Sequence, residues 1–188
     1  AYWGGPQKTT QLIFAISREP AVRVQKMAAG ECHITAPLRD IDIAALDKRS
    51  EVIILKTQAL NISYLAFNLK KAPTDQRRVR EALDIAVDRD ALFKVLFPRG
   101  DAMQAVSAFP PAIAGYNSEL KNEFNPERAK LLLAEAGLAG KLEIDLWALP
   151  ISRPTNPNAL SMAQLIPQDW PRIGVKATSK TYGWGEYP

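Results

Sequence analysis

Short apolar runs alternate with amphipathic stretches over the first sixty residues of the chain. The runs at 11–16, 32–34 and 52–55 have the length of buried strands. The stretches at 18–29 and 41–46 have helical spacing instead. Alternation of strands and helices is typical of an arrangement in which helices pack on a sheet. We therefore predict an α/β fold that begins with this part of the chain.

The pattern changes near residue 60. Residues 60–68 alternate partly and are rich in aromatic and β-branched side chains, which predicts an extended segment. From Pro73 onward the chain favours helices, with Asp75 placed to cap one helix and Asp90 to cap the next. The change from alternating elements to a helix-rich stretch predicts a domain boundary at this point.

A third helix has clear signals at both ends. Asn125 is a good N-cap, Pro126 suits the first helical position, and Gly137 is placed to stop the helix. Residues 142–149 then alternate between apolar and polar, which predicts a strand with one buried face, and Pro150 ends it.

One proline conflicts with the helical pattern that follows. A helix is predicted from about Asn158, but Pro167 inside it would remove the hydrogen bond to the Ala163 carbonyl, at a cost of about 3 kcal/mol. We predict that the helix kinks or ends early there. A last strand is predicted to begin at Gly174.

Composition and charge exclude some classes of protein. With 188 residues and 47% hydrophobic content, the chain can bury a sizeable core. The 24 Lys and Arg are interleaved with 20 Asp and Glu, and no basic stripe carries regularly placed aromatics, so we expect no nucleic-acid partner. The longest apolar runs fall far short of the roughly 20 residues of a spanning helix, so we expect no membrane span in this chain.

The sequence offers no constellation for catalysis or for a metal. Cys32 is the single cysteine and His33 the single histidine, so neither an internal disulfide nor a Cys/His zinc site can be assembled. Adjacent residues on a strand point to opposite faces, so this pair cannot act as nucleophile and base. Phosphate-binding and nucleophile-elbow motifs are absent from the sequence. We therefore expect no cofactor, no metal and no enzymatic activity, although a small α/β enzyme stays open as a minor reading.

The first residues have neither the basic nor the apolar part of a signal peptide, so they do not reveal the compartment.

Several segments, in order along the chain, resemble the extracellular solute-binding proteins of the peptide and nickel ABC importer class, family 5, and within it periplasmic dipeptide-binding proteins. These segments are 30–32, 64–68, 79–83 with 86–89, 116–117 with 125–132, and 145–158 with 182–187. Each is weak by itself. Their order over nearly the whole chain makes the resemblance specific.

The resemblance implies a periplasmic-binding-protein fold of two α/β lobes joined by hinge strands. Residues 1–60 then correspond to the C-terminal part of the first lobe, 61–68 to a hinge strand, and 69–188 to a second lobe that is incomplete at its C-terminal end. Family members are considerably longer than this chain, so we expect it to be an internal fragment. We also expect uncovered strand edges to promote self-association.

The family's function is implied in the same way. The protein would be the substrate-binding component of an ABC importer, which captures dipeptides or short peptides in the periplasm and delivers them to the membrane permease subunits. A receptor of the same family for a nickel chelate, haem, glutathione or an antimicrobial peptide is the alternative.

Three residues are the candidate ligand contacts. Arg153 lies in a proline-bounded segment after a strand, where its guanidinium could bind a carboxylate through two hydrogen bonds, although a surface arginine stacked on a proline fits the residues as well. In dipeptide-binding relatives the matching arginine pairs with the peptide's terminal carboxylate. Thr155 stands where those relatives have a tyrosine, so the side-chain preference of the pocket is expected to differ.

Trp184 is the third candidate, because it matches a tryptophan that packs against the bound peptide. A tryptophan near a strand end also serves as core or interface filler. The family's acidic contact to the peptide's amino group lies beyond Pro188, and its first-lobe contacts lie before Ala1. We therefore expect residues 1–188 alone to bind peptides weakly or not at all.

Overall fold

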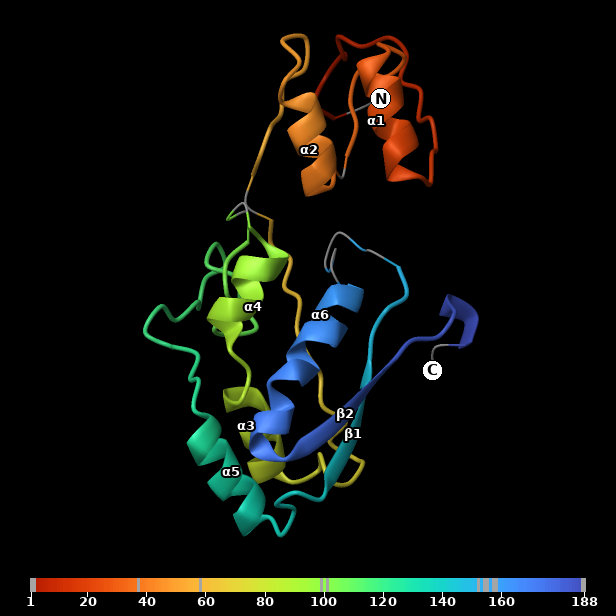
Figure 1. Ribbon diagram of the computed structural model, residues 1–188. Helices are drawn as coiled ribbons and strands as arrows, with labels where there is room; N and C mark the ends of the chain where they lie inside the picture. The colour runs from red at the N-terminus through yellow and green to blue at the C-terminus, as the bar shows by residue number, and fades with distance from the viewer. Residues whose placement is uncertain are drawn as a thin grey trace. The chain divides into compact units, whose positions relative to one another are not determined.

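The computed structural model describes residues 3–36, 38–57, 59–98, 100, 102–151, 153, 156 and 159–186, apart from the side chains of Asp40 and Trp184. The chain divides into two compact units, Ala1–Thr57 and Gln58–Pro188. Figure 1 shows helices α1 and α2 in the first unit, and the remaining helices with both strands in the second.

The described part of the first unit contains a pair of helices. Helix α1 spans Pro20–Ala28 and contacts α2, Asp40–Leu46. Both helices were predicted from the spacing of apolar residues. Asp42 accepts two side-chain hydrogen bonds from Arg39, at 2.7 and 2.8 Å, and a third from the Arg39 backbone N–H. These bonds from Arg39 hold the pKa of the Asp42 carboxyl below its usual range.

The three strands predicted in this unit are wrong for the chain as it stands. The described residues at 11–16, 32–34 and 52–55 form no strand. Most of their large apolar side chains are exposed instead, from 70% at Leu12 to 93% at Ile16, whereas Val52 and Ile54 are partly buried. A strand needs a neighbour for its backbone hydrogen bonds. No described segment of the unit pairs with these runs. Their apolar pattern is typical of buried strands, but the described part of this unit contains no strand that would cover them.

Residues 1–57 by themselves are expected not to fold. Among the described residues of this unit, Leu46 is the one hydrophobic side chain that is buried. One such side chain contributes about 1.5–3 kcal/mol, whereas ordering the backbone costs roughly 1–2 kcal/mol for every residue of the unit, so the summed cost is far larger. Circular dichroism of peptide 1–57 should show no cooperative melting, whereas 58–188 should melt cooperatively. A dispersed amide NMR spectrum of 1–57 would contradict this expectation.

Among its described residues, the second unit contains four α-helices and a parallel pair of strands. The helices are α3 Arg77–Ile85, α4 Arg89–Leu96, α5 Pro126–Glu135 and α6 Ala159–Leu165, and the strands are β1 Leu142–Trp147 and β2 Val175–Lys180. Three short 3-10 helices complete it: η1 Ile166–Gln168, η2 Trp170–Ile173 and η3 Trp184–Glu186. Strand β1, helix α6 and strand β2 follow one another in sequence, so they form the strand–helix–strand unit that parallel pairing requires.

A single core holds this unit together. Helices α3 and α5 pack against each other, and the buried face of the strand pair joins them (Figure 1). Trp170 is 1% exposed, and its indole Nε1 donates a hydrogen bond to the Leu83 carbonyl oxygen at 3.0 Å. The largest fully buried side chains around it are Leu83, Leu133, Val79 and Val175.

The signals around α5 and Pro167 were interpreted correctly. The Asn125 side chain accepts a hydrogen bond from the Arg128 N–H at 3.0 Å, and Pro126 opens the helix. Gly137 follows with φ +73°, a left-handed conformation that favours glycine. Helix α6 ends at Leu165, and Pro167 lies in the first turn of η1, which confirms the predicted early end.

The predicted caps of α3 and α4 were wrong. Helix α3 begins after Gln76, not after Asp75, and Gln76 makes no side-chain capping bond. Asp88, not Asp90, caps α4 by accepting from the Ala91 N–H at 2.9 Å. The reason is a long-range contact: Asp169 accepts a hydrogen bond from the Asp88 N–H at 2.9 Å, which fixes Asp88 as the residue just outside the helix.

Residues 59–68 have neither helix nor strand hydrogen bonding in the structure. Phe67 packs against the core of the second unit. The role of 61–68 as a hinge strand therefore stays a prediction.

Candidate ligand-binding site at the strand ends

The carboxyl ends of β1 and β2 form one edge of the sheet. The strands run parallel in a register from Leu142 opposite Val175 to Trp147 opposite Lys180, and Figure 1 shows them side by side. One more backbone bond, from the Ala148 N–H to the Lys180 carbonyl oxygen at 2.9 Å, extends the ladder. In open α/β sheets ligands bind outside the carboxyl ends of strands. Both predicted contact segments, with Arg153 and Trp184, leave from this edge.

Backbone hydrogen bonds with Asn156 fix the main chain at Arg153. Its N–H donates to the Asn156 carbonyl oxygen at 3.2 Å, and the Asn156 N–H donates back at 3.0 Å, which makes an isolated antiparallel bridge. Arg153 and Asn156 are both partly buried. Thr155, the third predicted contact, lies outside the described residues.

Asn156 is a neighbour of Arg153 that sequence reasoning missed. Side chains of two residues paired in an antiparallel bridge project to the same side. The Asn156 amide is therefore on the same side as the Arg153 side chain, and its buried Oδ1 has no hydrogen-bond partner among the described residues. An asparagine beside prolines indicates only a turn, so nothing in the sequence distinguished this position.

Trp184 opens η3 and lies inside a closed turn between Gly183 and Glu186. The Gly183 N–H donates to Glu186 Oε2 at 3.1 Å, and the Glu186 N–H donates to the Gly183 carbonyl oxygen at 2.9 Å. A Cβ on Gly183 would lie 3.3 Å from that same carboxylate oxygen, so a larger residue there would require a small shift of the Glu186 side chain. The backbone that carries Trp184 is thus fixed, although its side chain lies outside the described part of the structure.

Two further aromatic residues meet at this edge. The Trp147 and Tyr182 rings lie 4.5 Å apart between centroids with 32° between their planes, and the residues are 41% and 43% exposed. Lys180 Nζ lies 5.5 Å from the centroid of the Trp147 ring and 2.7 Å from Asp145 Oδ2. Period-two alternation could have placed each of these side chains on the outward face of its strand. The alternation does not reveal the register that pairs Trp147 with Lys180.

The charges on this outward face are paired across the two strands. The hydrogen bond from Lys180 to Asp145 raises the pKa of the lysine ammonium above its ordinary value. Lys180 therefore stays protonated at every physiological pH, and its charge remains beside the Trp147 ring as a cation–π partner. Nearer the start of the strands, Lys176 pairs with Glu143 at 3.0 Å.

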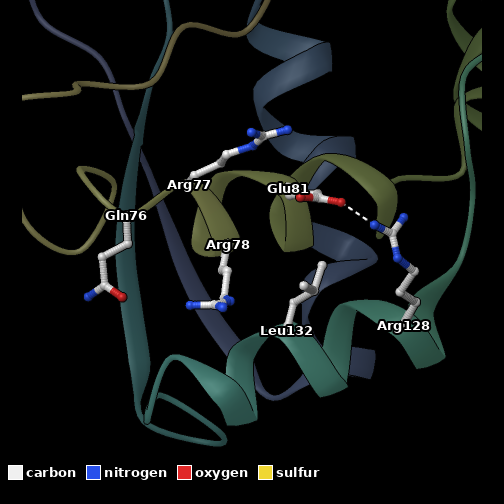
Figure 2. A pocket seen from close by; sticks show the side chains of 6 residues that line it. All are labelled: Gln76, Arg77, Arg78, Glu81, Arg128 and Leu132. Atoms are coloured by element: carbon white, nitrogen blue, oxygen red, sulfur yellow. Dashed lines mark hydrogen bonds and ion pairs between the residues drawn. The ribbon is translucent and has the colours of Figure 1, made fainter.

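A concave surface lies between α3 and α5, away from the predicted contacts. Figure 2 shows the residues that line it, which are Gln76, Arg77, Arg78, Glu81, Arg128 and Leu132. Its charges are largely paired: Arg128 binds Glu81, as the dashed line shows, and Arg78 lies 3.2 Å from Glu135. This pairing leaves little net charge to attract an ionic ligand.

The described residues offer neither a metal-binding cluster nor a membrane-spanning helix. Within them, no cluster of three or more His, Cys, Asp or Glu side chains is arranged to hold a metal ion. None of the helices in the described part of the chain is both long and apolar enough to cross a bilayer.

Known proteins match the chain along its whole length. Residues 1–188 match the family model of bacterial extracellular solute-binding proteins, family 5 Middle. The dipeptide-binding protein of Escherichia coli (strain K12) is 40% identical over 99% of the chain, and heme-binding protein A of Haemophilus influenzae is 38% identical over 99%. The chain spans about a third of the length of these relatives, at 35% and 34%.

A solved relative shows the same fold. The crystal structure of the dipeptide-binding protein from Pseudoalteromonas sp. SM9913, in complex with Met-Leu, superposes with a TM-score of 0.77 at 32% identity. The superposition covers 90% of this chain and 34% of that protein. The predicted α/β fold of the periplasmic-binding-protein type is therefore confirmed for a segment of such a protein. The chain belongs to the family 5 bacterial extracellular solute-binding proteins.

Proposed function

We propose that this chain is part of a receptor that captures dipeptides or short peptides and delivers them to the permease subunits of an ABC importer. The observation that carries this proposal is the match to a dipeptide-binding protein at 40% identity over nearly the whole chain. The structural match to a relative in complex with Met-Leu supports the same ligand class. The family consists of solute-binding proteins, so the proposed role is binding without catalysis.

The proposed contacts are Arg153, Thr155 and Trp184. Arg153 would bind the peptide's terminal carboxylate, because a guanidinium presents two parallel N–H donors to a carboxylate. Trp184 would supply a flat apolar wall and Thr155 a smaller neighbour than an aromatic residue would be. The parallel pairing of β1 and β2 supports placing these residues in one site, because both contact segments continue from the same edge of the sheet.

The division of the chain follows as part of the proposal. Residues 1–60 would complete the first lobe, 61–68 would act as a hinge strand, and 69–188 would form most of the second lobe. The solvent-exposed apolar runs in the first unit support this division, because in the longer protein they would pair with strands from outside 1–188. A receptor of this class that serves an importer would work in the periplasm.

Haem is the second candidate ligand. Heme-binding protein A of Haemophilus influenzae is nearly as similar to this chain as the dipeptide-binding protein is, at 38% against 40% identity. A large planar ligand would need a wider site than a dipeptide. Thr155 in place of the tyrosine of dipeptide-binding relatives favours such widening.

Mass spectrometry of the full-length protein under native conditions separates these candidates. The protein is expressed without added ligand, and the molecules that leave it on denaturation are identified. We expect peptides of two or three residues with free carboxyl ends. Release of haem or of a nickel chelate, with no peptide, would replace the proposal by its alternative.

A further inference from the structure

We propose that Trp147 and Tyr182 form a positioning pair that couples the two contact segments of the ligand site. Trp147 is the last residue of β1, and Tyr182 lies just beyond β2 and two residues before Trp184. The contacting rings would hold the Arg153 segment and the turn that carries Trp184 at a fixed spacing. This inference rests on the proposed roles of Arg153 and Trp184 as ligand contacts.

The backbone ladder ends just before the contact segments begin. Its last bond among the described residues joins the Ala148 N–H to the Lys180 carbonyl oxygen. Beyond that bond the chain continues from β1 toward Arg153 and from β2 toward Trp184, and no further backbone hydrogen bond joins these segments among the described residues. The ring contact at 4.5 Å is the side-chain link that continues the connection between them.

The Lys180 side chain strengthens the contact between the Trp147 and Tyr182 rings. Its ammonium lies 2.7 Å from Asp145 Oδ2 on β1 and 5.5 Å from the centroid of the Trp147 ring. An ammonium over an indole face attracts the ring through its quadrupole. The Trp147 ring is therefore held by the cation of Lys180 and by the Tyr182 ring, both of which come from the opposite strand segment.

The position of Tyr182 is transmitted to Trp184 through a short, closed turn. Gly183 follows Tyr182 directly, and its two hydrogen bonds with Glu186 close the turn that carries Trp184. A displacement of the Tyr182 ring would move this turn as a unit. The same displacement would release the Trp147 end of β1, from which the Arg153 segment continues.

Hydrogen exchange in the full-length protein tests the coupling without any ligand. Trp147→Leu removes the ring from β1, so amide exchange should accelerate at Gly183 and Glu186 on the other strand's side. Tyr182→Leu should accelerate exchange at Arg153 and Asn156 in return. Trp147→Phe and Tyr182→Phe keep a ring and should restore most of the protection. Glu143→Ala, at the opposite end of the same face, is the matched control and should leave both segments unchanged.

Binding provides the second readout. The affinities of a dipeptide and of its C-terminal amide are measured for each variant. If the pair aligns Arg153 with the carboxylate, the leucine variants should lower the preference for the free acid by about threefold to tenfold. The phenylalanine variants should keep most of that preference. A direct ligand contact would weaken acid and amide equally, and a purely structural role would lower the melting temperature without changing the preference.

The outcomes separate the two proposals. Unchanged exchange across the strands in the leucine variants, or equal weakening of acid and amide, overturns the positioning pair. A wild-type protein that binds neither form overturns the proposed peptide receptor. The exchange experiment then still decides whether Trp147 and Tyr182 couple the two segments.

Discussion

Replacing Arg153 by alanine in the full-length protein is expected to lower its affinity for a dipeptide by at least about 30-fold. Removing one partner of an enclosed charge pair costs about 2–5 kcal/mol, because the other charge is left without compensation. The loss should appear in the dissociation constant from calorimetry and should depend on the peptide's carboxylate. The amide form of the same dipeptide should bind wild type and Arg153→Ala with similar, weak affinity.

Two further variants make this test specific. Arg153→Lys keeps the charge but loses the planar pair of donors, so it should recover only part of the affinity. Arg172→Ala removes an exposed arginine of η2 that pairs loosely with Asp169 at 3.5 Å, and it should bind like wild type. Wild-type affinity in Arg153→Ala would remove Arg153 from the site.

Replacing Trp170 by alanine is expected to cost the second unit about 3–5 kcal/mol of its free energy of unfolding. The side chain is 1% exposed at the centre of the core, and the cavity left by an indole cannot be filled by its neighbours without strain. The free energy is measured by urea unfolding of residues 58–188, with the far-ultraviolet signal as the probe.

A graded series separates packing from hydrogen bonding at this position. Trp170→Phe keeps an aromatic ring but leaves the Leu83 carbonyl oxygen without its donor, so it should cost about 1–3 kcal/mol. Val95→Ala, at a position that is 64% exposed on α4, should change the free energy by less than about 0.5 kcal/mol. A loss below about 1 kcal/mol in Trp170→Ala would contradict the described core.

Elements with local signals at both ends were predictable from the sequence. Helix α5 needed only Asn125, Pro126 and Gly137, each of which acts on backbone within one turn. The early end of α6 at Pro167 has the same local origin, the missing N–H of proline. Such signals do not depend on which other segments are nearby.

Features that depend on distant residues were not predictable. The cap of α4 is decided by Asp169, which lies far along the chain from Asp88. The apolar runs of the first unit indicate buried strands, yet strands form only where partners exist, and no described segment of that unit provides one. The local pattern therefore indicates that these runs favour burial, but it does not indicate whether a partner strand is present.

The ligand site likewise has some features that the sequence indicated and others that depend on distant residues. Arg153, Thr155 and Trp184 came from a resemblance and remain proposed contacts, of which the structure describes the Arg153 bridge and the turn that carries Trp184. The Trp147–Tyr182 stack depends on the register between two strands and on the path of β2 beyond Lys180. Neither of these is determined by the local pattern of either strand.

Calorimetric titration of the full-length protein with a dipeptide tests the central claim most directly. The account predicts one site per molecule with a dissociation constant in the micromolar range or tighter, and at least about 30-fold weaker binding of the C-terminal amide. Absence of heat with di- and tripeptides, together with saturable binding of haem, would contradict it.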